Sequence, residues 1–178
     1  MNSVSATLHS NLPVVEVDLV EIPEITGASL FGGFQKRAIS NLEVLNEAYN
    51  YAKPSSFSRG MRIDLNGVAI LFISGTGSVD EEGKTVHVGD FRGQVRRTLK
   101  NITGLLASAG GTWHDVVRIT SYLRDMDRDY AAFNEERTAF YNELKIDPFP
   151  AATAIEARLC RPDLLLEIEA IAMFGTGR

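Results

Sequence analysis

Apolar residues recur along the chain at two spacings, one typical of β-strands and the other of α-helices. Residues 61–66 and 68–74 are rich in apolar and β-branched side chains and flank Asn66-Gly67, which predicts a β-hairpin. The same spacings predict further strands over 116–123, 151–159 and 164–174 and helices over 90–108 and 127–144. The order β-β-α-β-α-β-β indicates an α+β fold, in which a mixed sheet carries two helices on one face.

The last predicted strand has two unlike sides. One side is wholly apolar, which suits burial under the helices: Leu164, Leu166, Ile168, Ala170, Ala172 and Phe174. The other side combines apolar residues with two carboxylates: Leu165, Glu167, Glu169, Ile171 and Met173. Two helices cover only one face of such a sheet, so we expect the chain to self-associate through its helix-free face. A carboxylate should then lie in or near the interface between the chains.

The first 52 residues differ from the rest of the chain in their residue composition and hydrophobic pattern. Residues 1–13 are small and polar and predict a loose tail, and the alternation over 15–19 predicts a short strand. Ile39, Leu42, Leu45 and Tyr49 recur at helical spacing before Pro54, and so predict a helix. We therefore expect an N-terminal extension over 1–52 and one domain over 53–178.

Composition narrows the function classes. The 178 residues carry a net charge of −5, which disfavours a nucleic-acid partner held by a broad basic face. A single cysteine and three scattered histidines give no spacing suited to a disulfide framework or a metal. No apolar run is long enough to span a bilayer and the N-terminus lacks a basic signal segment, so we expect a cytoplasmic protein without a membrane partner.

Two side chains are candidates for chemistry. Glu167 stands in mid-strand among apolar neighbours, where loss of water would raise the pKa of its carboxyl toward the range useful for proton transfer. The alternative is that Glu167 or Glu169 pairs with an arginine across an interface. Cys160 could act as a nucleophile, although a lone cysteine near a strand end is more often buried and inert. Gly75-Thr76-Gly77 follows a strand but lacks the third glycine of a phosphate loop, which favours an ordinary loop.

A set of spaced residues between Phe57 and Phe174 resembles the RidA/YjgF family of small imine-handling proteins. The set consists of Ser74-Gly75, Gln94, Asn101, Ala109-Gly110, Asp115-Val116-Val117, Asp125, Asn134, Pro150 and the run 167–172. The resemblance implies a chorismate-mutase-like fold and a homotrimer with three clefts between its subunits. It also implies hydrolysis of reactive enamines and imines to keto acids and ammonia without metal or cofactor, in which an arginine holds the substrate carboxylate and a glutamate positions water.

Some residues of this chain match the site residues of the family, and others do not. Glu167 matches the glutamate, Ser74 and Asn134 match polar site residues, and Phe57 stands where the deaminase branch has tyrosine. The place of the carboxylate-binding arginine falls on Ala152, which cannot make the bidentate contact. We therefore expect Glu167 to be catalytic and the other substrate-binding residues to be Phe57, Arg59, Ser74, Gly75, Asn134, Thr153, Ala154, Arg158 and Cys160. Arg59, Arg158 and Arg161 are the candidate replacements for the missing arginine.

Three alternatives remain open for the function. The segments 57–60, 74–76 and 160–168 are similar to arginine-lacking relatives and to the RidA-like portion of chorismatases, which remove pyruvate from chorismate. A non-catalytic, metabolite-binding or chaperone-like trimer would fit the loss of the arginine. An RNA-cleaving protein, suggested by the family's older endoribonuclease label, is disfavoured by the negative charge and the lack of a histidine pair.

Overall fold

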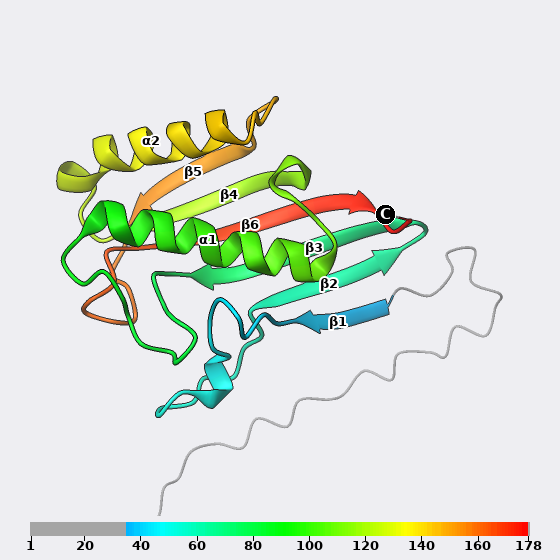
Figure 1. Ribbon diagram of the computed structural model, residues 1–178, viewed down its shortest axis with the longest axis horizontal. Helices are drawn as coiled ribbons and strands as arrows, with labels where there is room; N and C mark the ends of the chain where they lie inside the picture. Colours follow the sequence, from blue (N-terminus) through cyan, green and yellow to red (C-terminus); the bar gives the residue numbers. More distant parts are fainter. Residues whose placement is uncertain (1–34, 178) are drawn as a thin grey trace, which may run out of the picture. The chain divides into compact units, whose positions relative to one another are not determined.

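The computed structural model describes residues 35–177, which form a six-stranded mixed sheet with two helices packed on one face (Figure 1). The strands lie in the order β1-β2-β3-β6-β4-β5, and only β4 and β5 run parallel to one another. The α+β fold with a mixed sheet is therefore confirmed. The elements are β1 Gln35–Ile39, η1 Ala48–Asn50, β2 Gly60–Leu65, β3 Val68–Thr76, α1 Phe91–Ala109, η2 Trp113–Asp115, β4 Val116–Leu123, α2 Met126–Glu143, β5 Ala151–Glu156 and β6 Leu166–Gly175.

Local sequence signals set several of these boundaries. Asn66 and Gly67 both adopt positive φ, at 49° and 82°, and so form the tight turn of the β2–β3 hairpin. The Asp90 carboxylate accepts a hydrogen bond from the Gly93 amide and caps α1, which ends at Gly110 in the left-handed conformation. In the part of the chain that the structure describes, no helix is long and apolar enough to cross a membrane.

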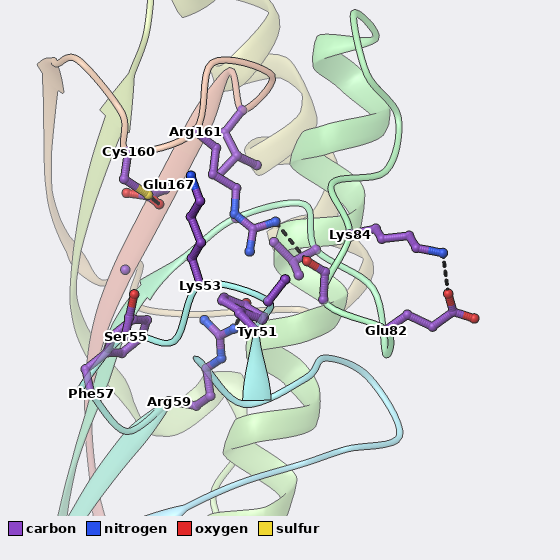
Figure 2. A pocket seen from close by; sticks show the side chains of 16 residues that line it. Tyr51, Lys53, Ser55, Phe57, Arg59, Glu82, Lys84, Cys160, Arg161 and Glu167 are labelled. Atoms are coloured by element: carbon purple, nitrogen blue, oxygen red, sulfur yellow. Dashed lines mark hydrogen bonds and ion pairs between the residues drawn. The ribbon is translucent and has the colours of Figure 1, made fainter. Parts of the chain in front are cut away.

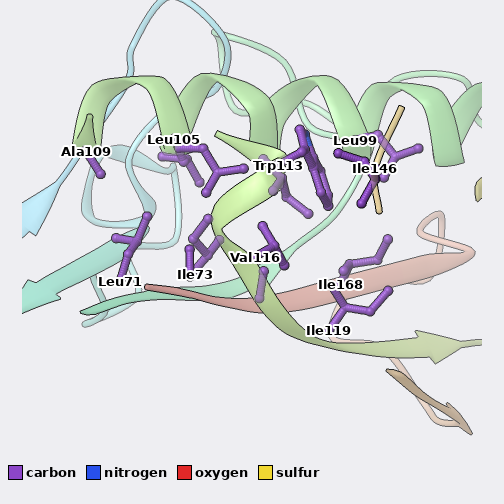
Figure 3. Packing of buried hydrophobic residues seen from close by; sticks show 14 of the residues in the cluster. Leu71, Ile73, Leu99, Leu105, Ala109, Trp113, Val116, Ile119, Ile146 and Ile168 are labelled. Carbon is purple, nitrogen blue, oxygen red and sulfur yellow. The ribbon is translucent and has the colours of Figure 1, made fainter. Parts of the chain in front are cut away.

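The core lies between the sheet and the two helices (Figure 3). The apolar side of β6 is buried there, with every side chain from Leu166 to Phe174 on that side at most 6% exposed. Leu71 and Ile73 of β3 contribute from the sheet, and Leu99 and Leu105 of α1 close over them. The expected burial of one side of the last strand under the helices is thus confirmed.

The opposite face of the sheet has no helix on it in the described part of the chain. Phe72 of β3 and Met173 of β6 are 43% and 45% exposed there, and β6 pairs Ile171 with Phe72. Glu169 lies on the same face and accepts a hydrogen bond from the Tyr122 hydroxyl at 3.0 Å. An open face of this composition is typical of surfaces that associate with another chain.

The segment before β2 differs from the predicted helix. Ile39 ends β1 and pairs with Gly60, and the chain then turns to the short η1. Leu45 is fully buried whereas Leu42 and Tyr49 are each 58% exposed, so the apolar residues at helical spacing do not share one face. The helix expected between Ile39 and Tyr49 is therefore wrong, because these residues pack separately. The strand expected over 15–19 lies outside the described residues, and the division at residue 52 remains a prediction.

Gln94 of α1 connects the helix to the loop that precedes β6. Its side chain is fully buried, and its amide nitrogen donates to the Asp163 carbonyl at 2.8 Å. Its amide oxygen accepts from the Leu165 backbone N–H at 2.8 Å. One side chain thus satisfies two backbone groups of loop 160–165 and fixes that loop against the helix.

Replacing Gln94 with Met should destabilise the protein. The two backbone groups would lose their partner, at a cost of about 1–3 kcal/mol for each that stays buried. Urea unfolding of Gln94→Met measures this free energy, with Lys100→Met on the exposed side of the same helix as the control. Equal free energies of unfolding for the two variants would contradict the role of Gln94.

The open face of the sheet should mediate self-association. Sedimentation at micromolar concentration should give a mass that is a multiple of the 19.5 kDa chain. Phe72→Glu, which places a charge on this face, should lower that mass, whereas the control Val88→Glu, at a 64% exposed position outside the sheet, should not. A wild-type monomer would contradict the prediction.

Candidate functional site

A cavity of about 570 Å³ opens where β3 ends and β6 begins (Figure 2). These two strands are neighbours, and the pairing of Thr76 with Ile168 lies at this end of the sheet. The rest of the wall comes from loops on either side, which contribute Tyr51, Lys53, Phe57, Arg59, Gly83, Cys160 and Arg161. The sheet therefore supplies a rigid floor and the loops supply most of the side chains.

Glu167 is the carboxyl group of the cavity. Its side chain is half-buried and lies over Gly75, where a Cβ atom would sit 3.5 Å from Glu167 Oε2. The Cys160 thiol donates a hydrogen bond to Glu167 Oε1 at 3.6 Å. Burial raises the pKa of Glu167, and it outweighs the opposing effects of the thiol and of the positive charges on Arg161 and Arg59. Glu167 is thus a partly desolvated carboxyl that lines a cavity of the single chain.

Tyr51 separates two guanidinium groups in the cavity wall. The guanidinium carbon of Arg161 lies 4.5 Å from the centre of the Tyr51 ring, and that of Arg59 lies 5.3 Å from it. Each contact is a cation–π interaction. The ring thus keeps two positive groups apart while holding both near Glu167 (Figure 2).

The two arginines are held differently. Arg59 is only 3% exposed, and its Nε and Nη2 donate to the Asn46 carbonyl at 2.9 and 2.7 Å, with a further bond from Nη2 to the Tyr51 hydroxyl. Burial lowers the pKa of Arg59, although the negative charge on Glu47 opposes this effect. Arg161 is more open and uses Nη1 to donate to the Gly83 carbonyl at 2.9 Å and to Thr85 Oγ1 at 3.4 Å.

Gly83 makes this arrangement possible. Its φ is +83°, a value that L side chains rarely adopt, and a Cβ atom here would lie 2.7 Å from the Tyr51 ring. The Gly83 N–H donates a hydrogen bond to the Asp80 carbonyl and closes a turn from Asp80 to Gly83. The turn thereby places a carbonyl under Arg161 and leaves room for the aromatic ring.

Half of the expected site residues lie in this cavity, namely Phe57, Arg59, Gly75, Cys160 and Glu167. Ser74 is adjacent, but its hydroxyl donates to the Ser58 carbonyl at 2.8 Å. Cys160 is exposed, so the expected burial of this cysteine is wrong. Burial and the charge on Glu167 raise the pKa of its thiol, which favours a hydrogen-bond donor over a thiolate nucleophile.

The other expected residues do not line this cavity within one chain. Asn134 lies on α2 and accepts a hydrogen bond from Arg137. Thr153 and Ala154 lie on β5, the edge strand farthest from the hairpin, and Arg158 is exposed beyond the end of β5. Ala152 also lies on β5, where it pairs with Ile119 and brings no cation to the cavity.

Sequence reasoning did not select Tyr51 and Lys53. Both lie at the boundary where an extension was expected to end, and no motif marks them. The nearest signal is the run of aromatic and basic residues from Tyr51 to Arg59. Among residues 35–177, no three His, Cys, Asp or Glu side chains are grouped so as to hold a metal ion.

Fold and site together describe a small α+β protein with an acid and two guanidinium groups in one cavity. The YjgF gene product of Escherichia coli has a similar structure, with a TM-score of 0.62 and 27% identity over 76% of this chain and 97% of that chain. A family profile described as Endoribonuclease L-PSP matches residues 51–174. The chain therefore belongs to this family, which is also known as RidA/YjgF.

Two curated proteins are similar to this chain in amino-acid sequence. A RutC family protein of Pyrococcus horikoshii is 39% identical over 102 residues, which cover 57% of this chain and 77% of the relative. The 3-aminoacrylate deaminase RutC of Acinetobacter baylyi is 36% identical over 103 residues, which cover 58% of this chain and 78% of the relative.

Replacing Gly83 with Ala should disturb the cavity wall. The control is Gly67→Ala, because Gly67 has nearly the same φ of +82° but no atom within 4 Å of an added Cβ. Both variants should lose about 1–2 kcal/mol from backbone strain, and Gly83→Ala should lose more because the Tyr51 ring must move. Urea unfolding measures the difference; equal losses would contradict the close packing of Tyr51.

Proposed function

We propose that this protein is a cofactor-independent hydrolase that deaminates a small carboxylated enamine or imine of the aminoacrylate class. The observation that carries the proposal is Glu167, a half-buried carboxyl with a raised pKa in a cavity that also holds guanidinium groups. The 36% identity to a 3-aminoacrylate deaminase supports the same class of substrate. Such a substrate needs a proton donor at carbon and a positive group for its carboxylate, and both are present.

In the proposed reaction Glu167 acts first as an acid and then as a base. Its carboxyl proton is transferred to the carbon of the enamine double bond that does not bear the nitrogen, while the nitrogen lone pair forms a C=N bond. The Glu167 carboxylate next takes a proton from a water molecule as the water oxygen bonds to the iminium carbon. That proton is passed to the nitrogen and the C–N bond breaks. Ammonia leaves while the hydroxyl proton returns to the Glu167 carboxylate and the carbonyl forms. One water is consumed and Glu167 ends protonated.

The raised pKa of Glu167 suits this sequence of steps. A raised pKa favours the protonated form of the carboxyl, which is the form that can donate a proton to carbon. Arg161 and Arg59 limit the rise, because both stabilise the carboxylate that remains after transfer. The Cys160 thiol also donates to that carboxylate, and so supports the charged form.

We further propose that three chains assemble through the open face of the sheet. Homotrimers are typical of the family, and the exposed Phe72 and Met173 support association through this face. Assembly would give Thr153, on the open side of the edge strand β5, a route to a neighbouring chain's cavity, whereas Ala154 packs against the core and Asn134 lies on α2 on the covered face.

A non-catalytic metabolite-binding trimer is the second candidate, and the alanine at position 152 favours it. A chorismatase-like activity shares the need for an acid at Glu167. Ammonia release from 2-aminoacrylate and 3-aminoacrylate, measured beside pyruvate release from chorismate, separates these three functions. Ammonia release from either aminoacrylate supports the proposal, and turnover of chorismate alone would replace it.

Glu167→Gln should abolish turnover without changing the oligomer. The amide cannot supply the proton, and general acid–base catalysis is worth about 100- to 10,000-fold in rate. Glu169→Gln is the matched control, since Glu169 lies two residues along the same strand and outside the cavity. Rates of ammonia release, corrected for the uncatalysed rate, measure the effect; wild-type turnover by Glu167→Gln would refute the assignment.

The pH dependence of kcat/KM should report the ionisation of the Glu167 carboxyl. Since the free enzyme needs the protonated acid, the rate should be highest at low pH and fall as pH rises through the raised pKa of Glu167. The midpoint should lie above the ordinary glutamate value of about 4.3. A profile that instead rises through this range would contradict the acid role.

A further inference from the structure

We propose that Arg161 forms a carboxylate-binding subsite in the cavity and replaces the arginine that the family places at the position of Ala152. The proposal rests on the proposed function only for the identity of the reacting molecule. Binding of a carboxylate by Arg161 can be measured without turnover.

Arg161 presents an unused pair of parallel donors. Its Nη1 is occupied by the Gly83 carbonyl and Thr85 Oγ1. Its Nε and Nη2 have no partner among the described residues, and no carboxylate there lies within ion-pair distance of the group. The Nε–Nη2 edge of a guanidinium matches the two oxygens of a carboxylate, so the free edge is suited to a bidentate contact.

The rival arginines offer no such edge. The Nε and Nη2 groups of Arg59 donate to the Asn46 carbonyl and the Tyr51 hydroxyl. Only its Nη1 is left to bind a carboxylate. Its role is to hold Tyr51 in place. Arg158 is exposed and does not line the cavity. Of the three candidate arginines, only Arg161 combines a free fork with a place in the cavity wall.

The Arg161 side chain is held in position before any ligand binds. The Tyr51 ring supports one side of its guanidinium at 4.5 Å, and the Gly83 carbonyl fixes one end. Thr85 donates its own hydroxyl proton to Asp163 at 3.0 Å and so keeps its oxygen free to accept from Arg161. A donor pair that is already oriented loses little entropy on binding, which strengthens the contact.

The position of Arg161 relative to Glu167 defines the ligand class. Both line the same cavity of about 570 Å³, and the charge on Arg161 acts on the Glu167 carboxyl. A carboxylate on Arg161 therefore leaves the rest of a small acid directed into a space shared with the proton donor. The subsite accordingly takes a small monocarboxylate, whose uncharged amide would lack the second oxygen and the charge that the fork recognises.

The test uses 3,3,3-trifluoropropionate as an unreactive probe, observed by ¹⁹F NMR on the full-length protein, with its amide as the uncharged counterpart. Wild type should bind the acid saturably and the amide much more weakly. Arg161→Gln should weaken binding of the acid about 10- to 100-fold, the range expected for loss of a charge-assisted hydrogen-bond pair. Arg158→Gln, the same change at an exposed arginine, should leave binding within twofold of wild type.

A second variant keeps the test decisive if Arg161→Gln unfolds. Arg161→Lys retains the charge but has no fork, and should weaken binding several-fold. Wild-type affinity in Arg161→Gln or Arg161→Lys, an equal loss in Arg158→Gln, or no saturable binding of the acid to wild type would each overturn the subsite. Failure of the proposed function looks different, because the probe would still bind through Arg161 in a protein that turns over no aminoacrylate.

Discussion

The site depends on one constraint, the desolvation of a carboxyl group on a strand whose other side is the core. β6 alternates buried and open positions along its length, so the register that buries Leu166 and Ile168 forces Glu167 onto the uncovered face. Gly75 on the neighbouring strand leaves room for the carboxyl to lie against the sheet. Burial then raises the pKa of Glu167, which favours the protonated form of a side chain that would be ionised in water.

The surrounding loops keep this carboxyl near positive charge without pairing it. A full ion pair with Arg59 or Arg161 would lower the pKa of Glu167 and remove the acid. Tyr51 lies between the two guanidiniums, and backbone carbonyls take up several of their donors. The cations therefore moderate the effect of burial instead of cancelling it. The same arrangement leaves the Nε and Nη2 donors of Arg161 without a partner among the described residues.

Most of the fold could be predicted from the sequence because its signals are local. Asn66-Gly67 specifies the hairpin, Asp90 and Gly110 bound α1, and the two-residue alternation of β6 assigns its faces. The segment around Leu45 could not be predicted in this way, since its apolar residues pack into separate places and mimic a helical spacing by coincidence.

The site was predictable only in part. Glu167 could be found because a mid-strand carboxylate among apolar residues is unusual. The placement of Tyr51 and the choice of Arg161 over Arg59 depend on which backbone carbonyls their neighbours reach, and that information lies in the meeting of three loops distant in sequence. The residues of β5 lie on the far edge strand and do not line the cavity of their own chain.

The account is tested most directly by the ionisation of Glu167 itself. A ¹³C NMR titration of glutamate side-chain carboxyls, with the signal of Glu167 assigned from its loss in a variant lacking that carboxyl, gives the pKa in the folded protein. The account predicts a value above the ordinary glutamate pKa of about 4.3. A value at or below that would mean that the carboxyl is solvated or fully paired, and would contradict its role as the acid of this cavity.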